Sequence, residues 1–287
     1  MLSSAKANLI GPDFLTRLNL QNPHDLKPVS GGDVNLAYSL YSGNDRYFLK
    51  VQPNHDKHFF DSEVASLKAL GKHVTVPKVI KQGECQGFAY LLLSWIPSGP
   101  ANQGDLGRAL AVLHQTTSSQ FGFDLSNEYD FVPKDNTWND SWGDFFVHQR
   151  LEPLMEQAIK KGFWLTQRGD HFDNLKKAIL NDEHVKNVKP FLLHGDLWAG
   201  NFMFDEQGQP VFIDPNAFYG DREYDIAITK VFPGFNKKFY EGYEDAYPLD
   251  EGYEDRFKWY EFYYILMHFV RFGDIYAPRL NRLLLQF

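Results

Sequence analysis

The sequence predicts an α+β fold of two lobes, a small β-rich lobe over residues 1–96 and a larger helical lobe over residues 97–287. Two observations support this division. Short apolar runs typical of strands dominate the first part of the chain, whereas apolar residues at helical spacing dominate the second. Between them lies Pro97-Ser98-Gly99-Pro100, the clearest cluster of breaking residues in the sequence.

Composition places the chain among ordinary globular proteins. Hydrophobic residues make up 43% of the 287 residues and aromatic residues 16%, enough for a substantial core. The net charge of −8 argues against a nucleic-acid partner, because no basic excess is available to neutralise phosphates. The single cysteine, Cys85, has no internal disulfide partner, which favours a reducing compartment. Without a signal-like or membrane-spanning run, we expect a cytoplasmic protein with no membrane partner. The sequence leaves the oligomeric state open, and a monomer is our expectation.

The first strands of the small lobe predict a phosphate-binding region. Residues 29–40 read as strand, turn and strand, with Gly31 and Gly32 at the bend. Glycines allow the backbone to pass close to phosphates and to offer amide donors. The next residue, Asp33, places a negative charge there for which the sequence offers no explanation.

Lys50 lies within the predicted strand Tyr47–Val51, enclosed by apolar residues. Burying a lysine is costly unless it meets anions, so we predict that Lys50 contacts the α- and β-phosphates of a nucleotide. The alternative is an edge-strand lysine whose amine reaches water. Glu63 follows thirteen residues later on a predicted helix over residues 60–70, where it can hold Lys50 by an ion pair. A solvated helix residue is its alternative.

The small lobe is completed by two further predicted strands, over residues 74–80 and 89–97. The second strand ends beside the breaker cluster and so forms the connector between the lobes. We predict that the adenine ring binds the backbone groups of Ser94, Trp95 and Ile96. In the large lobe, helices are expected near residues 106–114, 141–154, 163–180, 221–228, 257–269 and 271–287.

The stretch Leu192–Pro215 carries three groups that phosphoryl transfer requires. Asp196 is a loop carboxylate placed to accept a hydroxyl proton, and Asn201 follows it by five residues as a metal ligand. Residues 205–208 predict a hairpin turn, which brings Asp214 back beside Asn201 as a second ligand for Mg²⁺. The three groups together predict a site that holds a nucleotide triphosphate with its magnesium in the cleft between the lobes.

Two polar residues lie at the ends of predicted helices in the large lobe. Asp225 enters an apolar stretch at the start of a predicted helix. It either braces the Asp196 loop by accepting backbone hydrogen bonds or is an ordinary first-turn helix charge, and the sequence favours neither. His114 at a helix end is expected to be a packed residue rather than a ligand.

These motifs resemble the fructosamine/ketosamine 3-kinase family, a branch of the protein-kinase-like fold related to aminoglycoside and choline kinases. The signature is Leu193-His194-Gly195-Asp196-Leu197-Trp198-x-Gly200-Asn201, together with Ile213-Asp214-Pro215. Further matching segments span the rest of the chain: Val76–Val79, Leu113-His114, Asn136-x-Trp138 and Phe218-Tyr219-Gly220-x-x-Glu223-Tyr224-Asp225-x-Ala227. Trp198 separates this family from the related kinases.

The resemblance implies ATP-dependent phosphorylation of the third-carbon hydroxyl of a ketosamine such as ribulosamine or fructosamine, which leads to deglycation. By carry-over Asp196 is the base, Asn201 and Asp214 hold Mg²⁺, Lys50 with Glu63 fixes the phosphates, and Trp198 stacks on the sugar. The expected partners are glycated small-molecule amines or glycated lysines on proteins. Some relatives carry a cysteine in the glycine loop; here Gly31-Gly32-Asp33 removes that redox link.

Two other functions remain as alternatives at this level. The first is a related kinase with another acceptor, such as an aminoglycoside, choline or homoserine-like compound. Trp198 and the segment Gly220–Asp225 argue against it. The second is a noncatalytic nucleotide-binding protein. Against it argues the joint presence of five residues that phosphoryl transfer would use: Lys50, Glu63, Asp196, Asn201 and Asp214.

Overall fold

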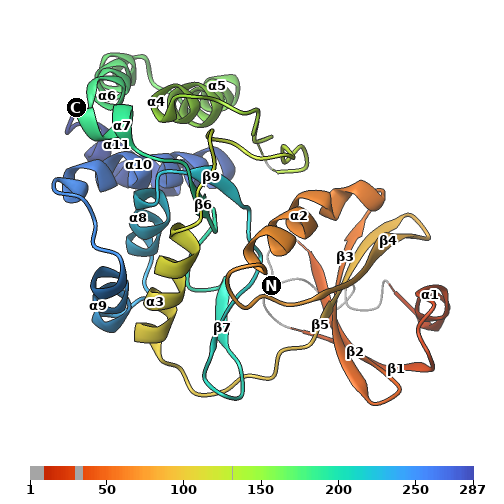
Figure 1. The fold of residues 1–287 in the computed structure, drawn as a ribbon. Helices are drawn as coiled ribbons and strands as arrows, with labels where there is room; N and C mark the ends of the chain where they lie inside the picture. The colour runs from red at the N-terminus through yellow and green to blue at the C-terminus, as the bar shows by residue number, and fades with distance from the viewer. Residues whose placement is uncertain (1–9, 30–34, 131) are drawn as a thin grey trace. The chain divides into compact units, whose positions relative to one another are not determined.

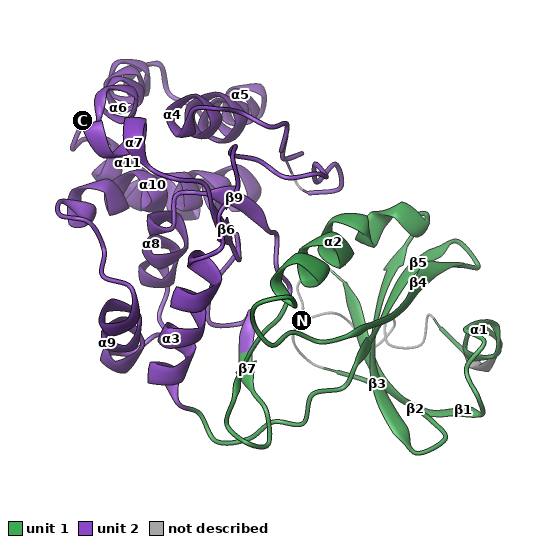
Figure 2. Cartoon of the chain, in the orientation of Figure 1, with its two compact units in different colours: residues 1–101, 203–213 green, residues 102–202, 214–287 purple. Residues whose placement is uncertain are grey.

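The structure, a computed structural model, describes residues 10–29, 35–130 and 132–287. The chain divides into two compact units (Figure 2). Unit 1 comprises the chain up to Ala101 together with Met203–Ile213, and unit 2 comprises Asn102–Phe202 and Asp214–Phe287. The first boundary therefore lies beside the breaker cluster, five residues beyond the division at residue 96 that the sequence suggested.

The hairpin Met203–Ile213 belongs to unit 1, whereas the sequence placed it in the C-terminal lobe. Its backbone hydrogen bonds explain the difference. The amide of Gly99 donates to the Phe204 carbonyl at 3.0 Å, and the amide of Phe212 donates to the Thr75 carbonyl at 3.0 Å. Both partners lie more than a hundred residues earlier in the chain, so local sequence gives no sign of them.

Unit 1 is built on an antiparallel sheet with the strand order β1-β2-β3-β5-β4 (Figure 1). Its strands are β1 (Pro23–Pro28), β2 (Leu36–Ser42), β3 (Asp45–Pro53), β4 (Val79–Cys85) and β5 (Phe88–Ser94). Residues 74–78, expected in a strand, are not in one, and β5 ends three residues before its expected end. Pro77 and Pro97 account for both differences, because proline cannot donate to a strand ladder.

The two faces of this sheet pack against different helices. Alternate residues of β5 divide between two core clusters, with Tyr90 and Leu92 in one and Leu91 and Leu93 in the other. The first cluster contains residues of helix α1 (Pro12–Arg17), and the second contains residues of η1 (Lys57–Phe60) and helix α2 (Asp61–Leu70). This alternation decides which strand side chains face α2.

Unit 2 is mainly helical. Its helical segments are α3 (Gln103–His114), α4 (Trp142–Phe146), η2 (Val147–Leu151), α5 (Glu152–Lys160), η3 (Thr166–Arg168), α6 (Gly169–Asn181), α7 (Glu183–Asn187), α8 (Glu223–Val231), α9 (Lys237–Ala246), α10 (Tyr253–Phe272), η4 (Gly273–Tyr276) and α11 (Ala277–Leu284). Helices α3 and α9 approach closely because glycines line their contact. A Cβ atom added at Gly107 would lie 2.1 Å from the Phe239 carbonyl oxygen.

Short strands frame the predicted catalytic stretch. Strand β6 (Phe191–Leu193) pairs antiparallel with β9 (Phe218–Gly220). Strands β7 (Phe202–Phe204) and β8 (Pro210–Phe212) form the predicted hairpin. Two backbone hydrogen bonds close the turn: the amide of Asp205 donates to the Gln209 carbonyl at 2.9 Å, and the amide of Gly208 donates to the Asp205 carbonyl at 2.8 Å.

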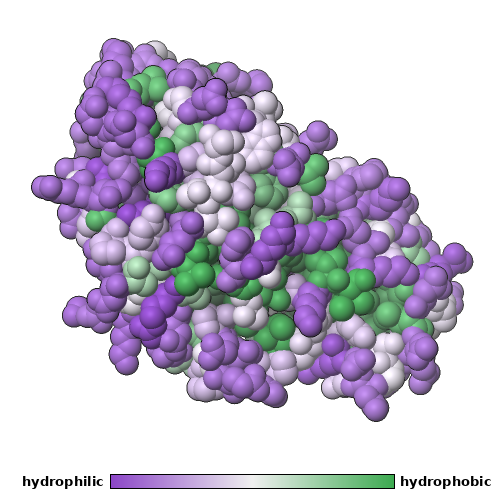
Figure 3. Space-filling model, in the orientation of Figure 1, coloured by the Kyte–Doolittle hydropathy of each residue, from purple (hydrophilic) through white to green (hydrophobic). Residues whose placement is uncertain are grey.

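Hydrophilic side chains cover much of the visible face in Figure 3, with smaller hydrophobic areas among them. The large aromatic side chains are mostly buried, and α10 contributes many of them to the core of unit 2. Among the described residues, no helix is long and apolar enough to cross a membrane.

Candidate active site

The loop that carries Asp196 begins directly after β6 and depends on the glycine before it. Gly195 has φ +80°, a conformation that residues with a side chain rarely adopt. A Cβ atom there would also lie 1.9 Å from the carbonyl oxygen of Asn216. The amide of Asn216 in turn donates to the His194 carbonyl at 2.9 Å. The loop after β6 and the segment after Asp214 are therefore held together by backbone contacts within unit 2.

Asp225 braces this loop from the first turn of α8. Its carboxylate accepts hydrogen bonds from the backbone amides of His194 at 2.7 Å and of Gly195 at 2.9 Å. The side chain is fully buried, unlike an ordinary first-turn helix charge. The brace interpretation of Asp225, which the sequence left open, is thus confirmed.

His114 completes the brace as a packed residue and not as a ligand. Its Nε2 lies 3.2 Å from Asp225 Oδ2 and its Nδ1 lies 2.8 Å from the hydroxyl of Tyr243. Burial lowers the pKa of His114, although the neighbouring Asp225 acts to raise it, so the ring is neutral at pH 7. Because a carboxylate only accepts, Nε2 carries the proton and Nδ1 accepts from Tyr243.

Asp196 and Asn201 lie together, as their spacing predicts. The Nδ2 group of Asn201 donates to the Asp196 backbone carbonyl at 2.7 Å and to Asp196 Oδ2 at 3.0 Å. Both amide hydrogens of Asn201 are therefore directed at Asp196. The Oδ1 atom of Asn201 is then the atom that can act as a metal ligand, and Mg²⁺ prefers oxygen ligands.

The second carboxylate oxygen of Asp196 has a partner that the sequence analysis missed. Tyr264 on α10 donates its hydroxyl to Asp196 Oδ1 at 3.0 Å. The sequence does contain one indication of this contact: residue 264 is a tyrosine in a predicted buried helix, and a buried tyrosine hydroxyl requires a hydrogen-bond partner. The sequence cannot name that partner, which lies 68 residues away.

Burial dominates the electrostatics of Asp196. Removal from water raises the pKa of its carboxyl, and Asp130 acts in the same direction. Lys134, His194 and the Tyr264 hydroxyl act to lower it. Lys134 forms an ion pair with Asp130 at 2.9 Å. Burial disfavours its charge, but Asp130 and Asp196 raise the pKa of Lys134 overall, so this cation remains charged near Asp196.

Asp214 ends the hairpin that the sequence predicted. It follows β8 with φ +52°, a left-handed conformation uncommon for a residue with a side chain. Such backbone outliers are concentrated at functional sites. With Asn201 it supplies the oxygen donors appropriate to Mg²⁺, so the residues fit the predicted metal.

Trp198 lies in the same loop and is 40% exposed. A Cβ atom added at Gly200 would lie 2.3 Å from the indole ring, so the ring rests against the glycine backbone. The amide of Asn201 donates to the Trp198 carbonyl at 2.9 Å. Gly200 thus allows an exposed aromatic surface to stand beside the metal-ligand candidate Asn201.

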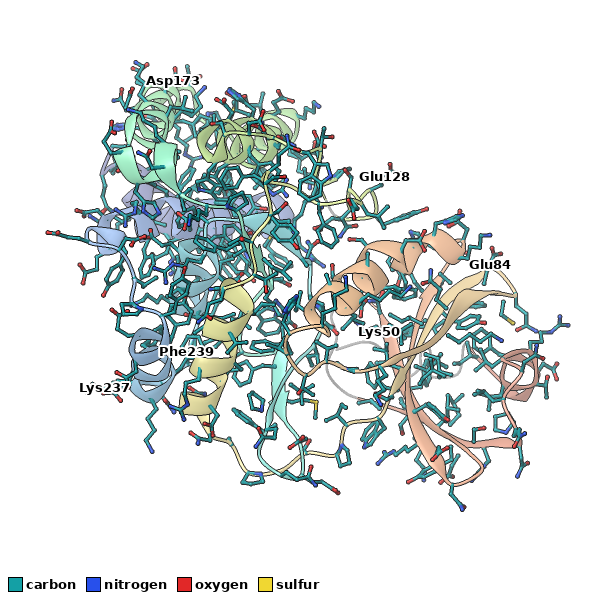
Figure 4. The ribbon with its side chains drawn as sticks, viewed as in Figure 1. Lys50, Glu84, Glu128, Asp173, Lys237 and Phe239 are labelled. Atoms are coloured by element: carbon teal, nitrogen blue, oxygen red, sulfur yellow. The ribbon has the colours of Figure 1, made fainter. Side chains whose placement is uncertain are left out.

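Lys50 and Glu63 form the predicted ion pair in unit 1. Lys50 Nζ lies 2.7 Å from Glu63 Oε1, and the lysine is only 4% exposed. Lys50 alternates with Leu49 and Val51, which face α1, so its side chain faces α2, where Glu63 is located. Figure 4 labels Lys50 on its strand. The pair excludes the water-reaching alternative for Lys50.

Two of the three backbone amides in the predicted adenine-binding connector already have acceptors. The amide of Ser94 donates to the Lys78 carbonyl at 2.9 Å and the amide of Trp95 to the Arg46 carbonyl at 3.3 Å. The Ile96 amide has no acceptor among the described residues. Gly31 and Gly32, with Asp33, lie outside the described residues.

Solved structures share this fold. A structure from Haemophilus somnus, described as "Putative fructosamine-3-kinase", superposes with a TM-score of 0.83 at 27% identity, covering 93% of this chain and 92% of that one. Aminoglycoside phosphotransferase APH(4)-Ia superposes with a TM-score of 0.63 at 15% identity over 95% and 96% of the two chains, which shows the fold alone. The fold and the site together define a phosphotransferase of protein-kinase-like fold.

Sequence relatives make the assignment more specific. The "Probable ketoamine kinase" of Lactiplantibacillus plantarum is 43% identical over 96% of this chain and 98% of its own length. That of Vibrio cholerae is 35% identical over 89% and 90%. Residues 14–287 match the fructosamine kinase family. The chain belongs to this family and is a kinase-type phosphotransferase, which excludes the noncatalytic alternative.

Proposed function

We propose that this chain transfers the γ-phosphoryl group of ATP to the third-carbon hydroxyl of a ketosamine, a step that leads to deglycation of the amine. The observation that carries the proposal is the geometry of Asp196. It is a carboxylate on a loop braced by Asp225, bonded to Asn201, and part of the fructosamine kinase signature. Such positioning provides much of the rate enhancement in phosphoryl transfer.

In this proposal each residue has one role. Asp196 accepts the proton of the attacking hydroxyl, and the new bond joins that oxygen to the γ-phosphorus while the bond to the β-phosphate oxygen breaks. Lys50, held by Glu63, binds the α- and β-phosphates. Asn201 and Asp214 hold Mg²⁺, which neutralises charge on the transferred group when bound. Trp198 offers its exposed ring to the C–H side of the sugar.

We also propose which residues bind the rest of the nucleotide and which acceptors the protein uses. The glycine bend at Gly31 and Gly32 covers the phosphates, and the connector Ser94, Trp95 and Ile96 holds the adenine. The backbone bonds already made by Ser94 and Trp95 make the Ile96 amide the donor of choice for the ring. The physiological acceptors are glycated small-molecule amines or glycated lysines on proteins, and the protein acts in the cytoplasm as a monomer.

The test is a panel of glycated lysines that differ only in the sugar, with ATP and Mg²⁺, and with the position of the new phosphate fixed by NMR. We expect a 3-phosphate on at least one ketosamine. Asp196→Ala should lower kcat at least about 100-fold, the range for a lost general base. Asp196→Asn is the matched variant, because it keeps the shape and removes only the charge.

Two results would contradict the proposal. One is near-normal turnover in both Asp196 variants. The other is a wild-type enzyme that ignores every ketosamine but phosphorylates an aminoglycoside, choline or homoserine-like acceptor from the same panel. Asp214→Ala should abolish the use of Mg·ATP, and unchanged metal dependence would remove Asp214 from the site.

A further inference from the structure

Helix α10 delivers two tyrosine hydroxyls, one turn apart, to two different carboxylates. Tyr260 donates to Asp221 Oδ2 at 2.7 Å, and Tyr264 donates to Asp196 Oδ1 at 3.0 Å. We propose that Tyr264 is a positioning residue that fixes the orientation of the Asp196 carboxylate for the acceptor hydroxyl. This inference rests on the proposed role of Asp196 as the base.

The need for such a residue follows from the torsions of aspartate. The terminal χ2 torsion of an aspartate is broad, so packing of the Cβ atom alone does not fix the carboxylate plane. Asn201 holds one oxygen, Oδ2, from within the same loop. Tyr264 holds the other, Oδ1, from a helix on a distant part of the chain. Two donors on different oxygens define the plane and leave a lone pair on each oxygen for the acceptor hydroxyl.

The hydroxyl of Tyr264 is itself rigidly presented. The residue is 4% exposed, and its backbone carbonyl accepts the Nδ1 proton of His268 at 2.8 Å. One turn earlier, the Tyr260 hydroxyl also accepts from the indole nitrogen of Trp142 at 2.9 Å. The ring of Tyr264 packs against those of Phe232 and His268, with centroids 6.1 and 4.7 Å away, and these contacts restrict the direction from which its hydroxyl reaches Asp196.

The competing explanation is that Tyr264 merely satisfies a buried hydroxyl. Tyr260 distinguishes the two, because it is the same residue type on the same helix face, also buried, and bonded to a carboxylate outside the proposed catalytic loop. Tyr264→Phe and Tyr260→Phe each delete one buried oxygen atom. Both variants should melt below the wild type, and Tyr260→Phe should melt lower, because it also removes the acceptor of the buried Trp142 indole N–H.

Activity should separate the two variants. In Tyr264→Phe we expect kcat with a ketosamine to fall about tenfold or more, because one hydrogen bond to a charged group is lost. The KM for ATP should not change. In Tyr260→Phe we expect kcat within about twofold of the wild type, because the lost bond lies away from the reacting atoms. A Tyr264→Phe enzyme whose kcat matches that of Tyr260→Phe overturns the positioning role.

A readout that needs no turnover separates this inference from the proposed function. If the wild type phosphorylates no ketosamine, the proposed function fails. The contact between the Tyr264 hydroxyl and the Asp196 carboxylate can still be measured directly by NMR. With ¹³C-labelled aspartate and Asp196→Asn to assign the signal, the Asp196 carboxyl resonance at fixed pH should move in Tyr264→Phe and stay in place in Tyr260→Phe. An unmoved signal in both variants contradicts the inference independently of any activity.

Discussion

The brace formed by Asp225 makes the sharpest prediction about this fold. Its carboxylate is fully buried and accepts two backbone amides of the Asp196 loop, from His194 and Gly195. Replacing it with alanine leaves both buried amides, and the Nε2 proton of His114, without their acceptor. Each unsatisfied buried donor costs about 1–3 kcal/mol, so Asp225→Ala should lower the free energy of unfolding by about 3–9 kcal/mol. Asp225→Asn should cost less, because its amide oxygen can still accept one of the two backbone bonds.

The measurement combines urea unfolding with hydrogen exchange of the loop amides. In Asp225→Asn we expect the amides of His194 and Gly195 to exchange faster, and kcat to fall, because the loop that positions Asp196 is no longer held at both points. Asp255→Asn is the matched control. Asp255 is also a first-turn acid, on α10, but its side chain is 83% exposed and paired with Lys258. Its loss should cost less than about 1 kcal/mol.

The reasoning would be refuted by equal losses of stability in the two asparagine variants together with unchanged protection of the His194 and Gly195 amides. That result would mean that Asp225 acts only through the helix macrodipole. The buried hydrogen bonds to the loop would then contribute nothing measurable.

Three further predictions concern other parts of the fold. Glu63→Gln should raise the KM for ATP and lower the free energy of unfolding by about 1–3 kcal/mol, because it removes a charged hydrogen-bond acceptor from a buried lysine; an ATP titration and a urea melt check both. Gly195→Ala should abolish activity, since the added Cβ atom would lie 1.9 Å from the Asn216 carbonyl oxygen. Gly43→Ala is the control, because Gly43 also has a positive φ, +60°, but has open space around it; it should cost only about 1–2 kcal/mol of stability and retain turnover. Burial opposes the charged form of His184, but Asp221 and Glu223 raise the pKa of its ring overall. The protonated ring therefore stabilises the folded state fully below the unfolded pKa of histidine, and this stabilisation is lost as pH rises through the folded pKa. Urea unfolding should therefore show the advantage of the wild type over His184→Gln shrinking as pH rises above the unfolded pKa of about 6.5, and a constant difference would contradict this sign.

The parts of the site that the sequence predicted are those whose partners are close in the chain or fixed by periodicity. Asp196 and Asn201 share one loop, five residues apart, so their contact needs little beyond a turn. Lys50 and Glu63 lie on a strand and the next helix, and period-two alternation alone decides that Lys50 faces that helix. The roles of these residues in binding ATP and Mg²⁺ stay predictions.

The parts that escaped prediction have distant partners. Strand β9 has only three residues, and nothing in Phe218–Gly220 distinguishes it from the loop around it until β6 supplies its pairing partner. The hairpin Met203–Ile213 joins unit 1 through carbonyl and amide groups near residues 75 and 99. A backbone hydrogen bond carries no side-chain signature, so sequence reading cannot detect it.

By itself, then, the sequence predicted the fold class from apolar periodicity and the family from the resemblance of its motifs, and local spacing predicted that Asp196 and Asn201 lie together. Only the tertiary structure decided that Asp225 is a brace and that Tyr264 touches Asp196. Both contacts join segments dozens of residues apart, and a buried carboxylate or hydroxyl shows in the sequence only that it requires a partner. Packing of the whole unit determines which partner it receives.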